Sequence, residues 1–369
     1  MNRETPGALL LFELIARRWA VPVAAKGLVF SLSQNRLAAP LADGRVALID
    51  CADPEPPDGR IAVDSAGRRA IAPRRIEPRP AMIAGAAEGE PARVAPGAGD
   101  GFLVAMGDAS LFRLDPDGTT TRIVAAGGSP LIGFDRRAAA TLVVTRDSAR
   151  LTRDAGPTSE GRPPAGVHAA ALSPDGATIA YGSETAIELA RSGSPGDILR
   201  RYEAPGPVSR IVWRDDGAFV AAACDEGGLL LVELQSGRSG TIGGFPAPPS
   251  TIAFSVPANA LVASGAYRIA AWSLARPPFD GDRSGALETG RPGRVEIAAV
   301  AAHPSRKLVA AAFADGAVAI AEPGRRDEMP LKGAGAAPAA LAWSADGRML
   351  AIAAADSVAI ASLPDALFK

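Results

Sequence analysis

A pattern of short apolar runs and turns recurs along this chain of 369 residues and limits its fold more than any other feature. The clearest copy extends from Pro338 to Leu363. In it, three apolar runs (339–343, 349–354 and 358–363) are separated by the turn sequence Ser344-Ala345-Asp346-Gly347 and by Asp356. Short apolar runs separated by turn residues predict β-strands joined by hairpins.

Weaker copies of this unit extend back into the first fifty residues. The apolar residues that open the middle strand of each copy are Leu37, Leu103, Leu142, Ile179, Val220, Leu261, Val309 and Leu350. The last five are separated by 41, 41, 48 and 41 residues. A period near 40 residues with three or four short strands per unit indicates the blades of a propeller, which cover one another's faces and close into a ring. We therefore predict an all-β fold, a closed β-propeller forming a single domain over residues 1–369. It has eight candidate repeat units, and seven blades are the alternative.

The turns between the predicted strands have a consistent chemistry. Leu172-Ser173-Pro174-Asp175-Gly176 shows the first turn most completely, with proline at the second turn position and glycine at the left-handed one. Asp43-Gly44 and Asp315-Gly316 are typical of a tight second hairpin. A large residue ahead of the first turn is expected to fill the space between adjacent blades. The residues concerned are Phe30, Phe134, Trp213, Phe254 and Trp343. We expect truncation of Trp343 to be more costly than truncation of Trp19, which lies beside two arginines.

From about residue 20 to residue 363 the chain resembles the WD40-repeat family, in particular its bacterial members, whose repeats carry a hydrophobic-Ser-Pro-Asp-Gly turn followed by Leu-Ala. No unit contains the Trp-Asp dipeptide or Gly-His, since the only histidines are His168 and His303. The resemblance implies a WD40-type propeller with degenerate repeats. It also implies that an N-terminal strand within residues 1–18 completes the last blade, and Leu9 to Leu14 is the segment we expect to do so.

The spacing is irregular at one place, between the first and second units. Residues 52–101 are rich in proline, glycine, arginine and alanine, and we interpret them as an insertion. Between Arg60 and Arg79 this segment holds six arginines. It lacks interleaved aromatic residues on which bases could stack, so a solvated loop is favoured over a nucleic-acid site.

Composition excludes several classes of protein. The net charge of -1 and the hydrophobic fraction of 47% argue against a disordered chain and against recruitment by nucleic acid or anionic membranes. Cys51 and Cys224 form no metal-binding or disulfide pattern, which favours a reducing compartment. No apolar run reaches the roughly 18 residues of a membrane span. We therefore expect a cytoplasmic monomer without nucleic-acid or membrane partners.

We find no catalytic motif and expect no cofactor and no metal. A Gly-x-Ser-x-Gly elbow and a phosphate-binding glycine loop before a helix are both absent from the sequence. The prediction is a non-catalytic scaffold that binds an unidentified protein through one rim of the propeller. The alternative is a propeller enzyme or a small-ligand binder that uses the central channel.

Loops that join the second and third strands of each unit are expected to lie on one rim, together with the connections between blades. Acidic residues recur in these hairpins, although aspartate also favours turns for backbone reasons. They are Asp43, Asp108, Asp147, Glu184, Asp225, Glu226, Asp315 and Asp356. The sixth unit has Tyr267 and Arg268 instead. With aromatic residues nearby, they predict a partner site on units six and seven, to which the acidic rim steers a basic segment. The residues of this predicted site are Phe245, Tyr267, Arg268, Phe313 and Asp315. The alternative for Phe245 and Phe313 is that they fill the junction between blades.

Overall fold

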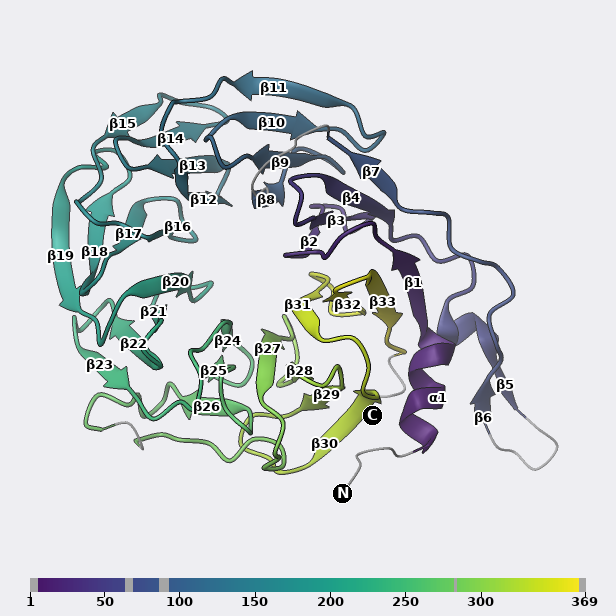
Figure 1. The fold of residues 1–369 in the computed structure, drawn as a ribbon. Helices are drawn as coiled ribbons and strands as arrows, with labels where there is room; N and C mark the ends of the chain where they lie inside the picture. Colours follow the sequence, from purple (N-terminus) through teal and green to yellow (C-terminus); the bar gives the residue numbers. More distant parts are fainter. Residues whose placement is uncertain (1–5, 64–68, 86–92, 282–283, 365–369) are drawn as a thin grey trace.

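The computed structural model describes residues 6–63, 69–85, 93–281 and 284–364, and eight antiparallel sheets form a ring around a central opening (Figure 1). Each residue predicted to open a middle strand lies in the second strand of a different sheet. The predicted eight-bladed, closed β-propeller is therefore confirmed, and the seven-bladed alternative is wrong.

The blades are numbered in chain order, and their strands run from the inner to the outer edge. Blade 1 contains β2 (Val29–Phe30), β3 (Arg36–Pro40), β4 (Val46–Asp50) and β7 (Met82–Ala84). Blade 2 contains β8 (Arg93–Pro96), β9 (Phe102–Ala105), β10 (Leu111–Leu114) and β11 (Thr120–Val124). Blade 3 contains β12 (Leu131–Arg137), β13 (Ala140–Thr145), β14 (Ala149–Arg153) and β15 (Ser159–Gly161). Blade 4 contains β16 (Ala169–Leu172), β17 (Thr178–Gly182), β18 (Ala186–Arg191) and β19 (Ile198–Glu203).

The second half of the ring repeats this arrangement. Blade 5 contains β20 (Val208–Trp213), β21 (Phe219–Cys224), β22 (Gly228–Glu233) and β23 (Ser239–Ile242). Blade 6 has β24 (Ile252–Ser255), β25 (Ala260–Ala263) and β26 (Ala270–Ser273). In place of a fourth strand, Ala286 bridges to Trp272 of β26, and Thr289 bridges to Ile269 just before it. Blade 7 contains β27 (Ile297–Ala302), β28 (Val309–Phe313), β29 (Val318–Ala321) and β30 (Glu328–Lys332). Blade 8 contains β31 (Pro338–Trp343), β32 (Met349–Ala354), β33 (Ser357–Ser362) and β1 (Ala16–Ala20).

The second strands are buried on both faces because each blade packs between two others. Every residue of β21 and of β28 is buried. Ala221 and Ala223 pack toward blade 6, whereas Val220 and Ala222 pack toward blade 4. Strands that are buried on both faces are apolar without alternation. The middle strands were therefore the part of each repeat that was easiest to recognise in the sequence.

The predicted turn chemistry is confirmed in the last blade. The Ser344 hydroxyl donates to Asp346 Oδ1 at 2.6 Å and accepts from the backbone N–H of Met349 at 2.9 Å. Gly347 has a φ of 72°, which glycine adopts without a steric penalty. The same contacts, with the same roles, link Ser173, Asp175 and Thr178 in blade 4.

The ring is closed by the N-terminal segment, but not by the residues expected. Leu9 to Leu14 lies in helix α1 (Pro6–Ile15), and β1 pairs with β33, with Trp19 opposite Val358. The prediction that 9–14 forms the closing strand is therefore wrong. Leucine, alanine and glutamate favour a helix there. The strand itself alternates in burial, with Arg17 and Trp19 facing inward. Because an arginine is usually exposed, this alternation could not be recognised in the sequence.

Burial also contradicts the expectation that truncating Trp343 costs more than truncating Trp19. Trp19 is 4% exposed, and its indole N–H donates to the carbonyl of Arg79 at 2.7 Å. Trp343 is only half-buried. Trp213 and Phe30 are buried between blades as predicted, whereas Phe254 is half-buried.

The extra segment lies within blade 1 and is shorter than predicted. Residues 51–81 connect β4 to β7 and include a short 3-10 helix, η1 (Pro57–Arg60), and a separate hairpin of β5 (Ile61–Val63) and β6 (Arg69–Ile71). Figure 1 shows this hairpin outside the ring, beside α1. The predicted range 52–101 also included β7 and β8, which belong to blades 1 and 2. No helix in the described part of the chain combines the length and the apolar character needed to cross a bilayer.

Candidate functional site

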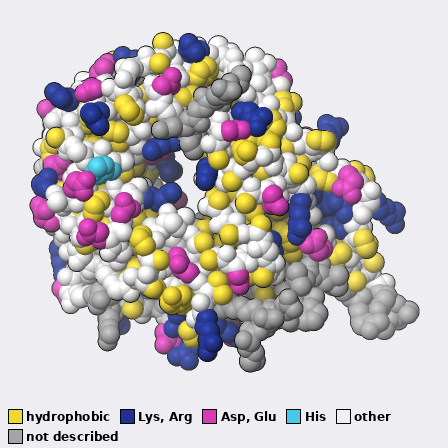
Figure 2. All heavy atoms as spheres, in the orientation of Figure 1, with side chains coloured by type: hydrophobic (Ala, Val, Ile, Leu, Met, Phe, Trp, Pro, Cys, Tyr) yellow, Lys and Arg dark blue, Asp and Glu magenta, His cyan; other side chains and the backbone are white. Residues whose placement is uncertain are grey.

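One face of the ring carries the hairpins between the second and third strands together with the connections between blades. In an antiparallel blade these segments leave the sheet at the same end, and we call this face the connecting rim. Figure 2 shows acidic and basic side chains around one end of the central opening. The residues predicted for the rim all lie in second-to-third hairpins: Asp43, Asp108, Asp147, Glu184, Asp225, Glu226, Tyr267, Arg268, Asp315 and Asp356.

Several rim carboxylates stabilise their own turns. Asp43 Oδ1 accepts from the N–H of Arg45 at 3.1 Å, Asp108 Oδ1 from that of Ser110 at 2.9 Å, and Asp315 Oδ1 from that of Ala317 at 3.1 Å. For Asp108, bonds to the hydroxyl and N–H of Ser110 hold the pKa of the carboxyl below its usual value. Aspartate therefore recurs in these hairpins because it stabilises their backbone, and its recurrence alone is weak evidence for a binding site.

The predicted site separates into an exposed part and a buried part. Tyr267 is 49% exposed at the tip of the blade 6 hairpin. Beside it, the Arg268 guanidinium donates to the carbonyl of Gly290 at 3.1 Å and so holds the segment that covers the outer edge of blade 6. Arg268 is thus half-buried and partly committed to structure.

Phe313 does not contribute to a surface. It is 2% exposed in the core between blades 6 and 7, because it ends β28 with its side chain directed between the sheets. The expectation that Phe313 contacts a partner is therefore wrong. Asp315 lies two residues further on and is half-buried in the turn that it stabilises.

Phe245 lies in the connection from blade 5 to blade 6, between the hairpins of these two blades. Its ring is half-buried, 6.0 Å from that of Trp272. The connection that carries it packs on the blade 6 hairpin, where the N–H of Ala247 donates to the carbonyl of Gly265 at 3.2 Å. The Phe245 carbonyl also lies 3.4 Å from where a Cβ on Gly227, in the blade 5 hairpin, would be. We call Asp225, Glu226, Phe245 and Tyr267 the blade 5–6 patch.

The patch has a mixed aromatic and acidic character. Asp225 and Glu226 are both exposed, at the tip of the hairpin between β21 and β22. The sequence singled out all four residues of the patch but placed its centre on units six and seven. The shift by one blade follows from the burial of Phe313, because a residue at the end of a fully buried strand cannot be distinguished by sequence from one in the hairpin that follows.

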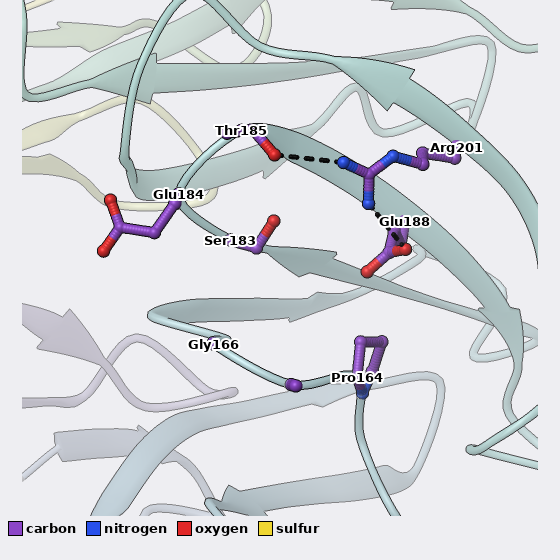
Figure 3. A pocket seen from close by; sticks show the side chains of 8 residues that line it. Pro164, Gly166, Ser183, Glu184, Thr185, Glu188 and Arg201 are labelled. Carbon is purple, nitrogen blue, oxygen red and sulfur yellow. Dashed lines mark hydrogen bonds and ion pairs between the residues drawn. The ribbon is translucent and has the colours of Figure 1, made fainter.

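A separate pocket of about 350 Å³ lies between blade 4 and the connection that leads into it from blade 3 (Figure 3). Arg201 on β19 donates to the Thr185 hydroxyl and to Glu188 Oε1, each at 3.0 Å. Its bonds to Glu203 and Glu188 raise the pKa of Arg201. Figure 3 shows Glu184 extending away from Arg201, and its carboxylate instead lies 2.9 Å from His168 Nε2. Sequence reasoning missed this pocket because the register that sets Glu188 opposite Arg201 has no signature in either strand alone.

The two cysteines and His303 are buried parts of the structure. Burial raises the pKa of Cys51 to about 12 and that of Cys224 to about 11, so both thiols are poor nucleophiles at neutral pH. His303 Nε2 donates to the carbonyl of Gly347 at 3.1 Å, its Nδ1 accepts from the N–H of Arg306, and burial lowers its pKa. Among the described residues, no three His, Cys, Asp or Glu side chains are placed to hold a metal ion.

Comparison with known proteins agrees with this architecture. No protein-family profile matches the chain, and no curated protein matches it in sequence. Among solved structures, it is similar to the crystal structure of the C-terminal WD40 domain of Sif2, with a TM-score of 0.65 and 13% identity. The match covers 95% of this chain and 99% of that one. At this identity the likeness shows a WD40-type propeller fold and nothing finer.

Proposed function

We propose that this protein is a non-catalytic WD40-type scaffold that binds a protein partner through the blade 5–6 patch of its connecting rim. The observation that carries the proposal is the 49% exposure of Tyr267 at the tip of the blade 6 hairpin, on which the connection from blade 5 packs, with Asp225 and Glu226 exposed in the blade 5 hairpin. Tyrosine dominates binding energy at interfaces when polar groups surround it, and loops on a rigid scaffold are where recognition residues concentrate.

The partner is a protein with a basic segment. Asp225 and Glu226 give the patch a negative charge that attracts lysine or arginine side chains and raises the rate of encounter. Asp147, Glu184 and Asp356 are exposed on other blades of the same rim and extend this attraction around it. Arg268 is turned toward the carbonyls of Thr289 and Gly290, and so does not cancel the charge at the centre of the patch.

The test is capture of partners from the native cell with the tagged full chain, comparing Tyr267→Ser with Tyr202→Ser. Tyr202 lies on the outer strand β19 and not in a rim hairpin, so it controls for loss of a tyrosine. We expect Tyr267→Ser to lose the partner with an unchanged melting temperature, and Tyr202→Ser to keep it. If both variants retain the partner, the patch is not the binding site.

A second arm tests the charge. Replacing Asp225 by Asn and Glu226 by Gln should slow association and weaken its dependence on salt, while dissociation changes little. Unchanged association kinetics would remove the acidic residues from the proposal and leave only the aromatic contact.

A further inference from the structure

Basic side chains lie on the inner strands around the central opening, apart from the residues of the connecting rim. The inner strands of the blades line this opening (Figure 1), and Figure 2 shows basic side chains on its wall. Arg93 begins β8 of blade 2, and Arg210 lies in β20 of blade 5. Both strands are the innermost of their sheets, and both side chains are exposed. Since blades 2 and 5 are not neighbours, the two arginines approach the opening from different sides.

These two arginines differ from the other two on the inner strands. Arg136 and Arg137, at the far end of β12, form ion pairs with Asp154 and Asp135. Within the described ranges, by contrast, neither Arg93 nor Arg210 has a hydrogen bond or a carboxylate partner. A charged side chain that is exposed without any partner is available to a ligand.

The surroundings of the pair are confined although both side chains reach solvent. Desolvation by the surrounding protein lowers the pKa of both, and the positive charge of Arg210 lowers the pKa of Arg93 further. Both side chains are thus exposed and yet partly desolvated, as expected for groups on the wall of a central channel. Like charges that interact across such a channel repel each other, and an anion between them would relieve that repulsion.

The local backbone around Arg210 accounts for the exposure of its side chain. A β-bulge precedes it, and bulges at the matching places of β12, β27 and β31 precede Gly133, Ala299 and Ala340. At Gly133 a Cβ would lie only 2.7 Å from that of Ala170 in the next blade. A position this close to the neighbouring blade leaves little room for a long side chain between the sheets, which agrees with the exposure of Arg210. Blade 5 alone among these four places a charged residue there.

We infer that Arg93 and Arg210 form a binding site in the central channel for a dianionic oxyanion of the phosphate class. Guanidinium groups bind such oxyanions through paired N–H donors. A phosphate monoester carries a charge of about -1.5 to -2 at pH 7 and offers three oxygens, enough for both arginines. A single carboxylate has one charge and two oxygens, and would leave one arginine uncompensated. The site is formed by inner strands and not by rim loops, so this proposal does not depend on the blade 5–6 patch.

The experiment is calorimetric titration of the full chain with inorganic phosphate and, separately, with a short phosphoserine peptide, in chloride buffer at constant ionic strength. Arg93→Gln and Arg210→Gln are tested singly and together. The control with the same change of charge is Arg113→Gln with Arg238→Gln, two exposed arginines that lie outside the inner strands. We expect one saturable site, weakened about tenfold or more by either single variant, abolished in the double variant, and unchanged in the control.

Arg210→Lys refines the result, because it keeps the charge but loses the paired donors and should give an intermediate loss. Tighter binding of the peptide than of inorganic phosphate would assign the anion to a partner protein, and equal binding would assign a free phosphate compound. Absence of saturable binding by both probes would overturn the site. So would a control that weakens binding as much as Arg93→Gln with Arg210→Gln.

Discussion

The indole N–H of Trp343 donates a hydrogen bond to the backbone carbonyl of Ala301, 3.1 Å away, and thereby joins the inner strand of blade 8 to that of blade 7. Trp213 makes the same contact with Ala171, at 3.4 Å, between blades 5 and 4. In both pairs the donor follows the acceptor by 42 residues. The repeat in the sequence is thus expressed as a repeated contact between consecutive blades.

Replacing Trp343 by Phe should lower the free energy of unfolding by about 1–3 kcal/mol, because the carbonyl of Ala301 loses its donor while most of the apolar contact remains. Trp213→Phe should cost less, since its hydrogen bond is longer. Urea titrations of both variants measure the difference. Wild-type stability of Trp343→Phe would show that this bond does not hold the blades together.

Trp19→Ala should cost about 3–5 kcal/mol, at least as much as Trp343→Ala, because the Trp19 side chain is the more deeply buried. This reverses the order expected from the flanking arginines. Chemical unfolding of the two alanine variants side by side decides the matter, and a clearly larger loss for Trp343 would contradict the structural ranking.

Asp53 is expected to stabilise the junction of β1 with blade 1. Its carboxylate pairs with Arg74 at 2.6 Å and lies 3.7 Å from Nε of the buried Arg17. Burial alone would raise the pKa of Asp53, but the bond from Arg74 and the charge of Arg17 together lower it. Asp53→Asn should therefore cost about 3–5 kcal/mol at pH 7, since a buried arginine loses its counter-charge.

The ion pairs of Asp53 also predict that the stability of the protein depends on pH. A carboxyl whose pKa is lower in the folded state stabilises the fold above its unfolded value of about 3.9, and this contribution is lost as the pH falls through the folded value. The difference between wild type and Asp53→Asn should shrink as the pH is lowered below about 4. A difference that stays constant down to pH 2 would mean that the charge of Asp53 is not what stabilises the junction.

Deletion of residues 1–20 should destabilise the protein more than deletion of residues 1–15. The longer deletion removes β1 and exposes the edge of β33, whereas the shorter one removes only α1, with its buried Phe12 and Ile15. Thermal melts of both truncations test this. Equal melting temperatures would show that the helix, and not the strand, accounts for the contribution of the N-terminus.

The sequence was informative where local chemistry decides the structure. Ser344, Asp346 and Gly347 form a turn from their own hydrogen bonds and backbone preferences, so the turn could be recognised without the rest of the fold. The middle strands were equally clear because both of their faces are buried. Counting such units gave the correct number of blades.

The sequence was misleading where burial depends on distant partners. Arg17 is buried in β1 because Asp53 and the carbonyl of Cys51, from the first blade, compensate its charge. The channel pair was missed for a similar reason, since Arg93 and Arg210 are 117 positions apart and lie around one opening only because the ring closes. Neither relationship leaves a pattern within one repeat.

The most direct test of the proposed scaffold role is photo-crosslinking in the native cell from a benzoylphenylalanine placed at position 267, compared with one at position 199. Both native residues are about half exposed, Tyr267 at 49% and Leu199 at 48%, but Leu199 lies on the outer strand β19. The proposal predicts a discrete crosslinked protein from position 267 and none from position 199. Crosslinking to the same proteins from both positions, or none from position 267, would contradict it.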